Sequence, residues 1–251
     1  PSASALAVNR ILDSNGSQIL GRLNANGQVY LINPNGILFG RTAQVNVGAL
    51  VASTLDVDTA SLAGNKHVFS GKGGGSIVNE GTIRAADGGY VALVSAKISN
   101  SGTIAAHAGS VLMGAGSQVT LDLGGPVKLQ VTQGALDTLI DNGGAIRADG
   151  GQVYLTAKAA GELAASVINN TGVIEAHTLA TGEKGQIVLL GDMKKGNLHV
   201  AGVLDASAPQ GGDGGFIETS ANQVDIGAVR VTTAAPRGKT GTWLIDPNDF
   251  T

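Results

Sequence analysis

The sequence contains no cysteine, only 6 prolines and few aromatic residues, which make up 3% of its 251 positions. The absence of cysteine excludes disulfide scaffolds, thiol chemistry and zinc sites built on thiolates. The low proline content and the lack of a Gly-X-Y period exclude collagen. Charged residues supply only 14% of the chain and hydrophobic residues 43%, so enough apolar surface is available to bury and disorder is not expected.

Long apolar runs and an excess of one charge are missing as well. No run approaches the roughly 18–20 apolar residues of a membrane-spanning helix, and the first residues show no charged-then-apolar export signal. The net charge is -3, from 16 basic and 19 acidic residues that are scattered singly. Without a basic stripe to neutralise phosphates, nucleic-acid binding has no support. We expect a processed or excised piece of a longer protein, neither membrane-spanning nor bound to nucleic acid.

Glycine, in contrast, is abundant, with 39 residues, and much of it belongs to an internal repeat. The pattern Gly-x-(Ile/Leu)-x-Ala is followed each time by a second strand-like run that also opens on glycine. The first run begins at Gly81, Gly102, Gly144, Gly172 and Gly202, and the second at Gly89, Gly109, Gly151, Gly185 and Gly215. An asparagine precedes the first run in most copies, and a histidine is its expected equivalent in the last: Asn79, Asn100, Asn142, Asn170 and His199.

This repeat predicts an all-β fold. Val, Ile and Leu alternate with small or polar residues, so each run has one apolar face. A short run cannot bury that face alone, whereas stacked coils bury a continuous core and pair their backbones. We predict a right-handed parallel β-helix, a β-solenoid, of roughly nine or ten coils with one or two extra-helical hairpins. Glycine and asparagine are expected at its corners because they accept positive φ. One motif position is expected to form an inward ladder of Ile83, Ile104, Ile146, Ile174 and Leu204.

The domain organisation follows from the same pattern. We predict a single β-helix domain over residues 1–251, with a distinct region at 1–75 and repeating coils over 76–251. Residues 54–72 lack the repeat and are expected to leave the rod as a hairpin or excursion. The first-run glycines Gly102 and Gly144 lie 42 residues apart. That gap leaves room for one degenerate coil, which we place at residues 126–140.

Candidate catalytic and metal-binding residues are few. β-Helix enzymes that act on pectin-like polymers need carboxylates clustered on adjacent coils. Asp87, Asp149 and Asp213 occupy comparable positions, but each precedes glycine in Asp-Gly-Gly, which is typical of a turn. The histidines lack a partner at metal-ligand spacing and are expected on the exposed surface: His67, His107, His177 and His199. We predict no catalytic residues, no metal and no cofactor, and therefore no enzyme.

Two tyrosines hold the same place in two strand-like runs. Tyr30 and Tyr154 each follow Gly-Gln-Val, and Tyr90 lies one step away in its own run. Alternation predicts that Tyr30 and Tyr154 point outward. Exposed aromatic rings can stack on sugars, but ordinary strand propensity explains these residues equally well.

One stretch differs from the repeats. At residues 33–37 the sequence reads NPNGI, in which the turn dipeptides Asn-Pro and Asn-Gly are fused. The surrounding block 8–54, together with 62–83 and 241–251, resembles the secretion domain of filamentous-haemagglutinin-type exoproteins, the passenger partners of two-partner secretion in Gram-negative bacteria. The resemblance implies export of the unfolded chain through the periplasm and across the outer membrane by a dedicated barrel transporter. It also implies a motif needed for secretion, formed by Asn33, Pro34, Asn35, Gly36 and Ile37.

The expected function is a non-enzymatic structural and adhesive segment of a large secreted or surface-bound exoprotein. Its expected partners are the transporter and, as a further candidate, a host-cell or bacterial surface receptor or glycan. Two alternatives stay open: the stalk of a contact-dependent toxin delivery exoprotein, and a β-helical enzyme acting on polysaccharides. The NPNGI motif either contacts the transporter or stabilises the first coils, and we favour the second role. Family members begin with further residues that cap the rod, so the strand near Leu6 is expected to pair with another chain.

Overall fold

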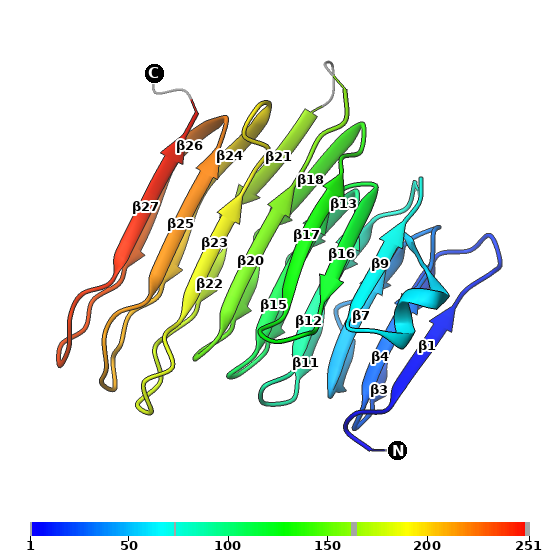
Figure 1. Ribbon diagram of the computed structural model, residues 1–251, viewed down its shortest axis with the longest axis horizontal. Helices are drawn as coiled ribbons and strands as arrows, with labels where there is room; N and C mark the ends of the chain where they lie inside the picture. The colour runs from blue at the N-terminus through cyan, green and yellow to red at the C-terminus, as the bar shows by residue number, and fades with distance from the viewer. Residues whose placement is uncertain (1, 73, 162–164, 249–251) are drawn as a thin grey trace.

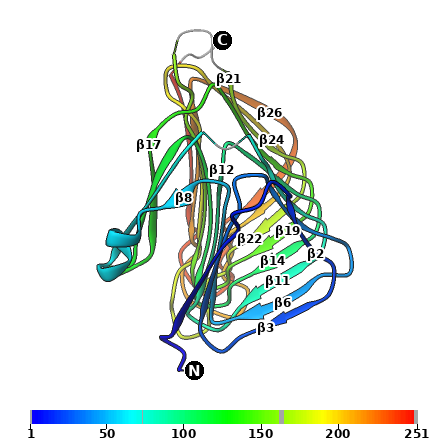
Figure 2. The same cartoon turned by 90° about the vertical axis from the view of Figure 1, so that its right-hand side faces the viewer.

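The computed structural model describes residues 2–72, 74–161 and 165–248, and it forms a parallel β-helix. Figure 1 shows the strands stacked side by side along the rod, and Figure 2 shows its triangular cross-section. Each regular coil contributes one strand to each of three faces before the chain rises to the next coil. The predicted all-β solenoid is therefore confirmed. Among the described residues, no helix has the length and apolar character needed to cross a membrane.

The first face is a nine-stranded parallel sheet. Its members are the longer strands of the coils and follow one another in chain order, each paired with the corresponding strand of the coils before and after. They are β1 Leu6–Arg10, β4 Gln28–Ile32, β7 Ala49–Ser53, β12 Tyr90–Ser95, β15 Ser110–Ala115, β20 Gln152–Ala157, β23 Gln186–Leu190, β25 Phe216–Ala221 and β27 Thr242–Pro247.

The other two faces are joined into one sheet by the long strand β24 Gly196–Asp205, which pairs with the long strand β26 Gln223–Thr232. The second face, called here the asparagine face, contains β2 Ser17–Ile19, β5 Ile37–Phe39, β10 Ile77–Asn79, β13 Lys97–Asn100, β18 Asp137–Asn142 and β21 Ala165–Asn170. The third, called here the isoleucine face, contains β3 Arg22–Asn24, β6 Gln44–Val47, β11 Thr82–Ala85, β14 Thr103–Ala105, β19 Ala145–Arg147 and β22 Val173–Glu175.

The isoleucine face carries the predicted ladder. Ile83 pairs with Ile104, Ile104 with Ile146, Ile146 with Ile174, and Ile174 with Leu204, all in register. Each of these side chains is fully buried in the continuous core cluster inside the rod. One motif position thus supplies one column of the core, as the repeat predicts.

The glycines that open the runs have a different role from the one expected. A Cβ placed on Gly144 would overlap the carbonyl oxygen of Gly102, and one on Gly151 would overlap that of Gly109. The same relation continues along the rod, from Gly144 to Gly172 and on to Gly202. Of the ten glycines that open the runs only Gly202 has a positive φ, and no described asparagine has one. Positive φ at the corners is confirmed for glycines such as Gly36, Gly88 and Gly150, but the prediction was wrong for the asparagines and for most of the run-opening glycines. The run-opening glycines are needed because neighbouring coils approach too closely for a side chain.

The asparagines of the repeat form an internal ladder. The side-chain amide of Asn79 donates to the Oδ1 atom of Asn100, Asn100 donates to Asn142, and Asn142 donates to Asn170, each over 2.7 Å. The final amide, on Asn170, donates to the carbonyl oxygen of Ala201. All four asparagines are 0–1% exposed, and the chain of hydrogen bonds satisfies amides that would otherwise destabilise the interior.

The choice of His199 as the next member of this ladder was wrong. Asn170 pairs with Val200, whereas His199 pairs with Asn169 and points away from the core. Each asparagine stands two residues before the glycine of its motif, and the same spacing from Gly202 identifies Val200. Val200 is fully buried, so the ladder ends with an apolar side chain.

A separate antiparallel four-stranded sheet lies against the outer surface of the nine-stranded sheet (Figure 2). Two insertions build it, and both leave the rod at the corner between the nine-stranded sheet and the asparagine face. The first insertion contributes β8 Asp56–Val57, the 3-10 helix η1 Thr59–Ala63 and β9 Lys66–Ser70. The second contributes the hairpin of β16 Gln118–Asp122 and β17 Lys128–Gln133. The sheet order is β17-β16-β9-β8.

The degenerate coil predicted at residues 126–140 does not exist. Its first part is β17, which leaves the rod, and its last part is β18, the ordinary asparagine-face strand of the next coil. The 42-residue gap between Gly102 and Gly144 thus contains an excursion and no additional coil. The alternation of residues 128–133 suits an extra-helical strand equally well, because Leu129 and Val131 are buried beneath this sheet.

Candidate functional site: the Asn33–Ile37 corner

The NPNGI stretch forms the turn that joins β4 to β5. The backbone N–H of Gly36 donates to the carbonyl oxygen of Asn33 over 3.1 Å and closes the turn. Gly36 has a φ of +113°, a backbone conformation that a side chain would strain. Pro34 fixes the φ of the turn and has no N–H that would need a partner. The residue types therefore suit a rigid corner at the point where one face ends and the next begins.

Asn33 is the buried centre of this corner. The residue is 0% exposed, and both polar atoms of its side chain are hydrogen-bonded, as a buried amide requires. The Nδ2 atom donates to the carbonyl oxygen of Asn15 and to the hydroxyl of Ser17, both over 2.9 Å. The Oδ1 atom accepts from the backbone N–H of Asn35 over 2.9 Å. One side chain therefore shapes the turn and fastens it to the preceding coil.

Further hydrogen bonds attach the corner to the coils on both sides. On the preceding side, the amide of Asn35 donates to the carbonyl oxygen of Asp13 over 2.8 Å. On the following side, the N–H of Ile37 donates to the carbonyl oxygen of Ser76 over 3.0 Å, and Gly75 donates to Pro34 over 3.2 Å. The corner thus joins three successive coils. Pro34 and Asn35 are its exposed residues, whereas the side chain of Ile37 is buried in the core.

The aspartates considered as catalytic candidates occupy turns and bind neighbouring groups. Asp87 is exposed and precedes Gly88, whose φ is +74°. The carboxylate of Asp213 lies 3.2 Å from the Nζ atom of Lys184, and it accepts the backbone N–H of Lys239. Both hydrogen bonds hold the pKa of Asp213 below its ordinary value, the bond from the backbone N–H having the larger effect. Within the described residues, no group of three or more His, Cys, Asp or Glu side chains could hold a metal ion.

Three of the four histidines have partners, which the sequence did not reveal. His177 is half-buried between two carboxylates: its Nδ1 atom lies 2.8 Å from Asp149, and its Nε2 atom 3.4 Å from Asp205. The hydrogen bond that His177 donates to Asp149 is the largest of the causes that raise the pKa of His177 to about 9, and the same bond lowers the pKa of Asp149. His199 lies 2.7 Å from Asp225. The expectation of no partner was wrong for His177 and His199 because their partners come from neighbouring coils, 20 or more residues away in the sequence. His107 is exposed, as expected.

His67, the third histidine that has a partner, lies inside the molecule. His67 is 4% exposed, and its Nδ1 atom lies 2.8 Å from the hydroxyl of Tyr30. That hydroxyl also lies 3.0 Å from the hydroxyl of Tyr90, which donates to the side chain of Gln28. Burial lowers the pKa of His67 and raises that of Tyr30. The network fastens the four-stranded sheet to the nine-stranded sheet.

The tyrosines therefore follow the predicted alternation but not the predicted exposure. Tyr30 points out of the rod and is nevertheless 0% exposed, because the four-stranded sheet covers it and packs Phe69 and Val57 nearby. Tyr90 is covered in the same way. Tyr154, one of the pair found in the sequence, lies beyond the cover and is only partly buried.

Comparisons with known proteins agree with this architecture. The family model of the TPS secretion domain matches residues 1–204. A heme/hemopexin-binding protein of Haemophilus influenzae is 36% identical over 203 residues, which cover 76% of this chain and 22% of that protein. A second heme/hemopexin-binding protein of Haemophilus influenzae is 44% identical over 70 residues, or 28% of this chain and 8% of that protein.

A solved structure is similar as well. The HMW1 secretion domain from Haemophilus influenzae superposes with a TM-score of 0.83 at 28% identity, covering 97% of this chain and 63% of that one. The chain spans only a minor part of the length of the heme/hemopexin-binding relatives, 22% and 8%. Because the family model covers most of the sequence, the chain belongs to the family of TPS secretion domains, the export domains of two-partner secretion exoproteins.

Proposed function

We propose that this domain directs a large exoprotein through an outer-membrane transporter of the two-partner secretion type, and that the Asn33–Ile37 corner serves export by locking the first coils as they fold. Family membership supports the transporter as the partner. The observation that carries the role of the corner is the buried Asn33 side chain, which binds residues 15 and 17 and shapes a turn bonded to Ser76.

A folding role for the corner suits a chain that is still unfolded when it emerges from its transporter. Each coil of a β-helix contacts only its neighbours, so the coils that leave the transporter first have the fewest partners. A corner that joins three coils at once supplies contacts that a single pair of strands lacks. Only Pro34 and Asn35 of the motif are exposed on the folded domain, which leaves a small surface for recognition there.

The test compares two asparagines of the same region. Asn33→Ala removes the buried amide, whereas Asn26→Ala changes an exposed asparagine in the preceding turn, between β3 and β4. We expect Asn33→Ala to lower both the unfolding free energy of the purified domain and the amount of full-length exoprotein in the medium when the transporter is co-expressed. Asn26→Ala should leave both values near wild type. Normal stability of the Asn33→Ala domain combined with lost export would contradict the folding role and assign the motif to transporter contact.

For the exoprotein as a whole, we propose a non-enzymatic structural and adhesive segment held at the bacterial surface. Support comes from the uniform repeat and from the turn and pairing roles of Asp149 and Asp213. A polysaccharide-active enzyme is the competing function. Turnover of pectins or alginates by the purified domain, abolished by Asp149→Asn or Asp213→Asn, would contradict the adhesive proposal. Binding to cultured host cells by the full exoprotein, and not by a variant that retains only this domain, would place adhesion outside residues 1–251.

A further inference from the structure

The outer surface of the nine-stranded sheet is covered over only part of its length. The four-stranded sheet packs on the outward residues of β4, β7, β12 and β15, including Tyr30 and Leu112. Beyond this cover the same surface continues across β20 and β23. There the outward residues Tyr154 and Leu190 are partly exposed, whereas Val188, which pairs with Tyr154, is buried. An intramolecular sheet-on-sheet interface therefore stops midway along an apolar surface.

The cover ends at β17, the terminal strand of the four-stranded sheet. β17 pairs with β16 on one side, and no strand of the described residues pairs along its other side. Its exposed side chains are polar, while Leu129 and Val131 point down onto the rod. Such an edge presents backbone N–H and C=O groups that can accept another strand.

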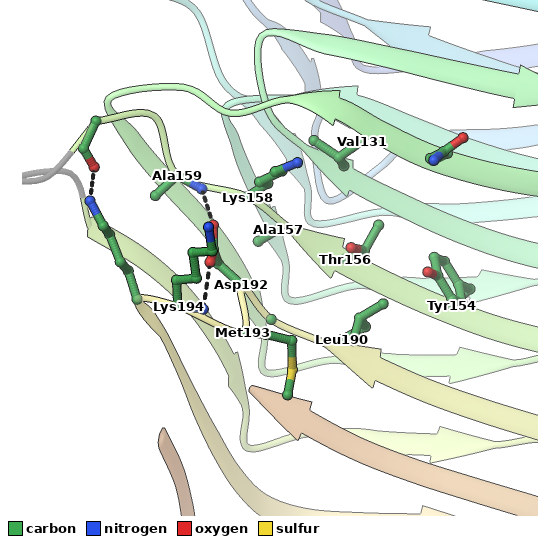
Figure 3. Close-up of a pocket in the computed structure, with 14 residues that line it drawn as sticks. Val131, Tyr154, Thr156, Ala157, Lys158, Ala159, Leu190, Asp192, Met193 and Lys194 are labelled. Carbon is green, nitrogen blue, oxygen red and sulfur yellow. Dashed lines mark hydrogen bonds between the residues drawn. The ribbon is translucent and has the colours of Figure 1, made fainter. Parts of the chain in front are cut away.

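A hollow lies directly beside this edge. It has a volume of about 710 Å³, and Figure 3 shows residues of β17, β20, β23 and the loop after β23 around it. Its apolar lining comes from Val131, Tyr154, Leu190 and Met193. These side chains continue the apolar surface on which the four-stranded sheet already packs.

The charged groups of the lining are mostly positive: Lys158, Lys194 and Lys195. The acidic residue of the lining is Asp192. Its carboxylate already accepts the backbone N–H groups of Ala159 and Lys194 (Figure 3). Lys195 donates to the carbonyl oxygen of Gly161, and Lys158 and Lys194 are exposed. The hollow therefore combines an apolar floor with a positive rim.

We propose that this hollow binds an extended acidic peptide, which adds as a fifth strand to the free edge of β17. A strand beside β17 would lie about 4.8 Å away, over β20 and β23, and would continue the existing sheet-on-sheet packing. Alternate apolar side chains would contact Tyr154 and Leu190. Acidic side chains would approach the lysines. This site is separate from the Asn33–Ile37 corner, and the proposal does not depend on the proposed role in export.

Charge favours such a peptide over a second copy of this domain. Pairing the β17 edges of two copies would bring the lysines of both rims together, and like charges at a short distance oppose association. An acidic strand meets the same lysines with favourable electrostatics. The backbone of β17 supplies hydrogen bonds that do not depend on the peptide sequence. The alternation of apolar and acidic side chains along the peptide therefore distinguishes the partner from other extended chains.

The test uses a fluorescein-labelled peptide, Glu-Val-Glu-Val-Thr-Val-Glu-Val, titrated with the purified domain. We expect saturable binding and slower hydrogen exchange of the β17 amides in the complex. The double reversal Lys158→Glu with Lys194→Glu should weaken binding at least about tenfold. The matched control is Arg22→Glu with Arg84→Glu, which reverses two exposed charges on the isoleucine face and should leave binding unchanged.

Two methylated peptides separate strand addition from simple charge attraction. Valine N–H groups point to one edge of the extended peptide and those of the other residues to the opposite edge. N-methylation of one set should therefore abolish binding, while methylation of the other set should be tolerated. Equal binding of both methylated peptides, no saturation with the parent peptide, or an unaffected Lys158→Glu, Lys194→Glu variant would overturn the proposal. A domain dimer that protects the β17 amides and resists the peptide would identify a second copy as the occupant and would also overturn it.

Discussion

The amide of Asn100 donates to the carbonyl oxygen of the Asn142 side chain over 2.7 Å, although the two residues lie 42 positions apart and neither is more than 1% exposed. Asn142 in turn donates to Asn170, so it is both acceptor and donor within the ladder. Hydrogen bonds of this kind fix which coil lies beside which. A slip by one residue would turn every asparagine outward and expose the core column.

We expect Asn142→Ala to lower the unfolding free energy by about 2–5 kcal/mol. The change leaves the Asn100 donor and the Asn170 acceptor buried without partners, and each lost partner costs about 1–3 kcal/mol. Urea denaturation of the purified wild-type and Asn142→Ala domains measures the difference in unfolding free energy. The control is Asn169→Ala, whose amide bonds Asp141 on the outside of the same face and should cost less than about 1 kcal/mol. Equal losses from both changes would contradict the structural role of the ladder.

Adjacent glycines provide a test of the close approach between coils. A Cβ on Gly144 would overlap the carbonyl oxygen of Gly102, whereas a Cβ on Gly143 would have its nearest neighbour, the Thr171 hydroxyl, at 3.7 Å. Gly144→Ala should therefore destabilise the domain by about 1–3 kcal/mol. Gly143→Ala should be neutral or should stabilise by up to about 1 kcal/mol, because alanine restricts the unfolded chain. Thermal and urea unfolding of the two variants should differ in this direction, and similar stabilities would show that the coils can move apart at little cost.

Gly36 combines a positive φ with a confined position. A Cβ there would lie 3.1 Å from the carbonyl oxygen of Ser76, in a backbone conformation with a φ of +113°. Gly211 also has a positive φ, +141°, but no atom lies within 4 Å of its added Cβ. Gly36→Val should therefore cost about 2–4 kcal/mol and Gly211→Val about 1–2 kcal/mol. An equal shift of the two urea midpoints would show that backbone strain alone matters at residue 36.

His177 should make stability depend on pH in the alkaline range. The pKa of its imidazole is raised from 6.5 to about 9 in the folded domain, mainly by the hydrogen bond that it donates to Asp149. The folded state therefore holds this proton more tightly than the unfolded state. The stabilisation is complete below pH 6.5 and is lost as the pH rises through 9. His177→Gln should flatten the unfolding free energy between pH 6.5 and 9, measured by urea denaturation at each pH.

Asp149→Asn removes the carboxylate partner of His177 and is measured in the same way, by urea denaturation at each pH. It removes the main cause of the raised pKa and should flatten the same pH window. Because the pKa of Asp149 is itself lowered, wild type should gain stability from this carboxylate above its ordinary pKa and lose it as the pH falls. A wild-type curve that is level between pH 6.5 and 9 would contradict the pairing of His177 with the carboxylates.

The repeat was enough to predict the coils, because one residue type at one spacing determines each column. Ile146 and its neighbours stack as the pattern requires. The pairing of insertions could not be read from the sequence in the same way. Tyr30 is buried by strands that begin 26 or more residues later in the chain, and no local pattern connects β9 to β16.

The site was predictable in part. Fused turn dipeptides marked the corner at Asn33–Ile37, and the structure places a tight turn there. The partners of Asn33 could not be foreseen, since Asn15 and Ser17 lie in a loop and a short strand without a repeat signature. The same limit applies to His177, because stacking brings Asp149 and Asp205 to it from two different coils.

The transporter dependence of export tests the central proposal most directly. The full exoprotein that contains residues 1–251 should be produced with and without its outer-membrane transporter, and the medium assayed for folded, protease-resistant protein. We expect export only when the transporter is present, with an unfolded, protease-sensitive form retained in the periplasm when it is absent. Equal amounts of exoprotein in the medium under both conditions would contradict the assignment of this domain to transporter-dependent export.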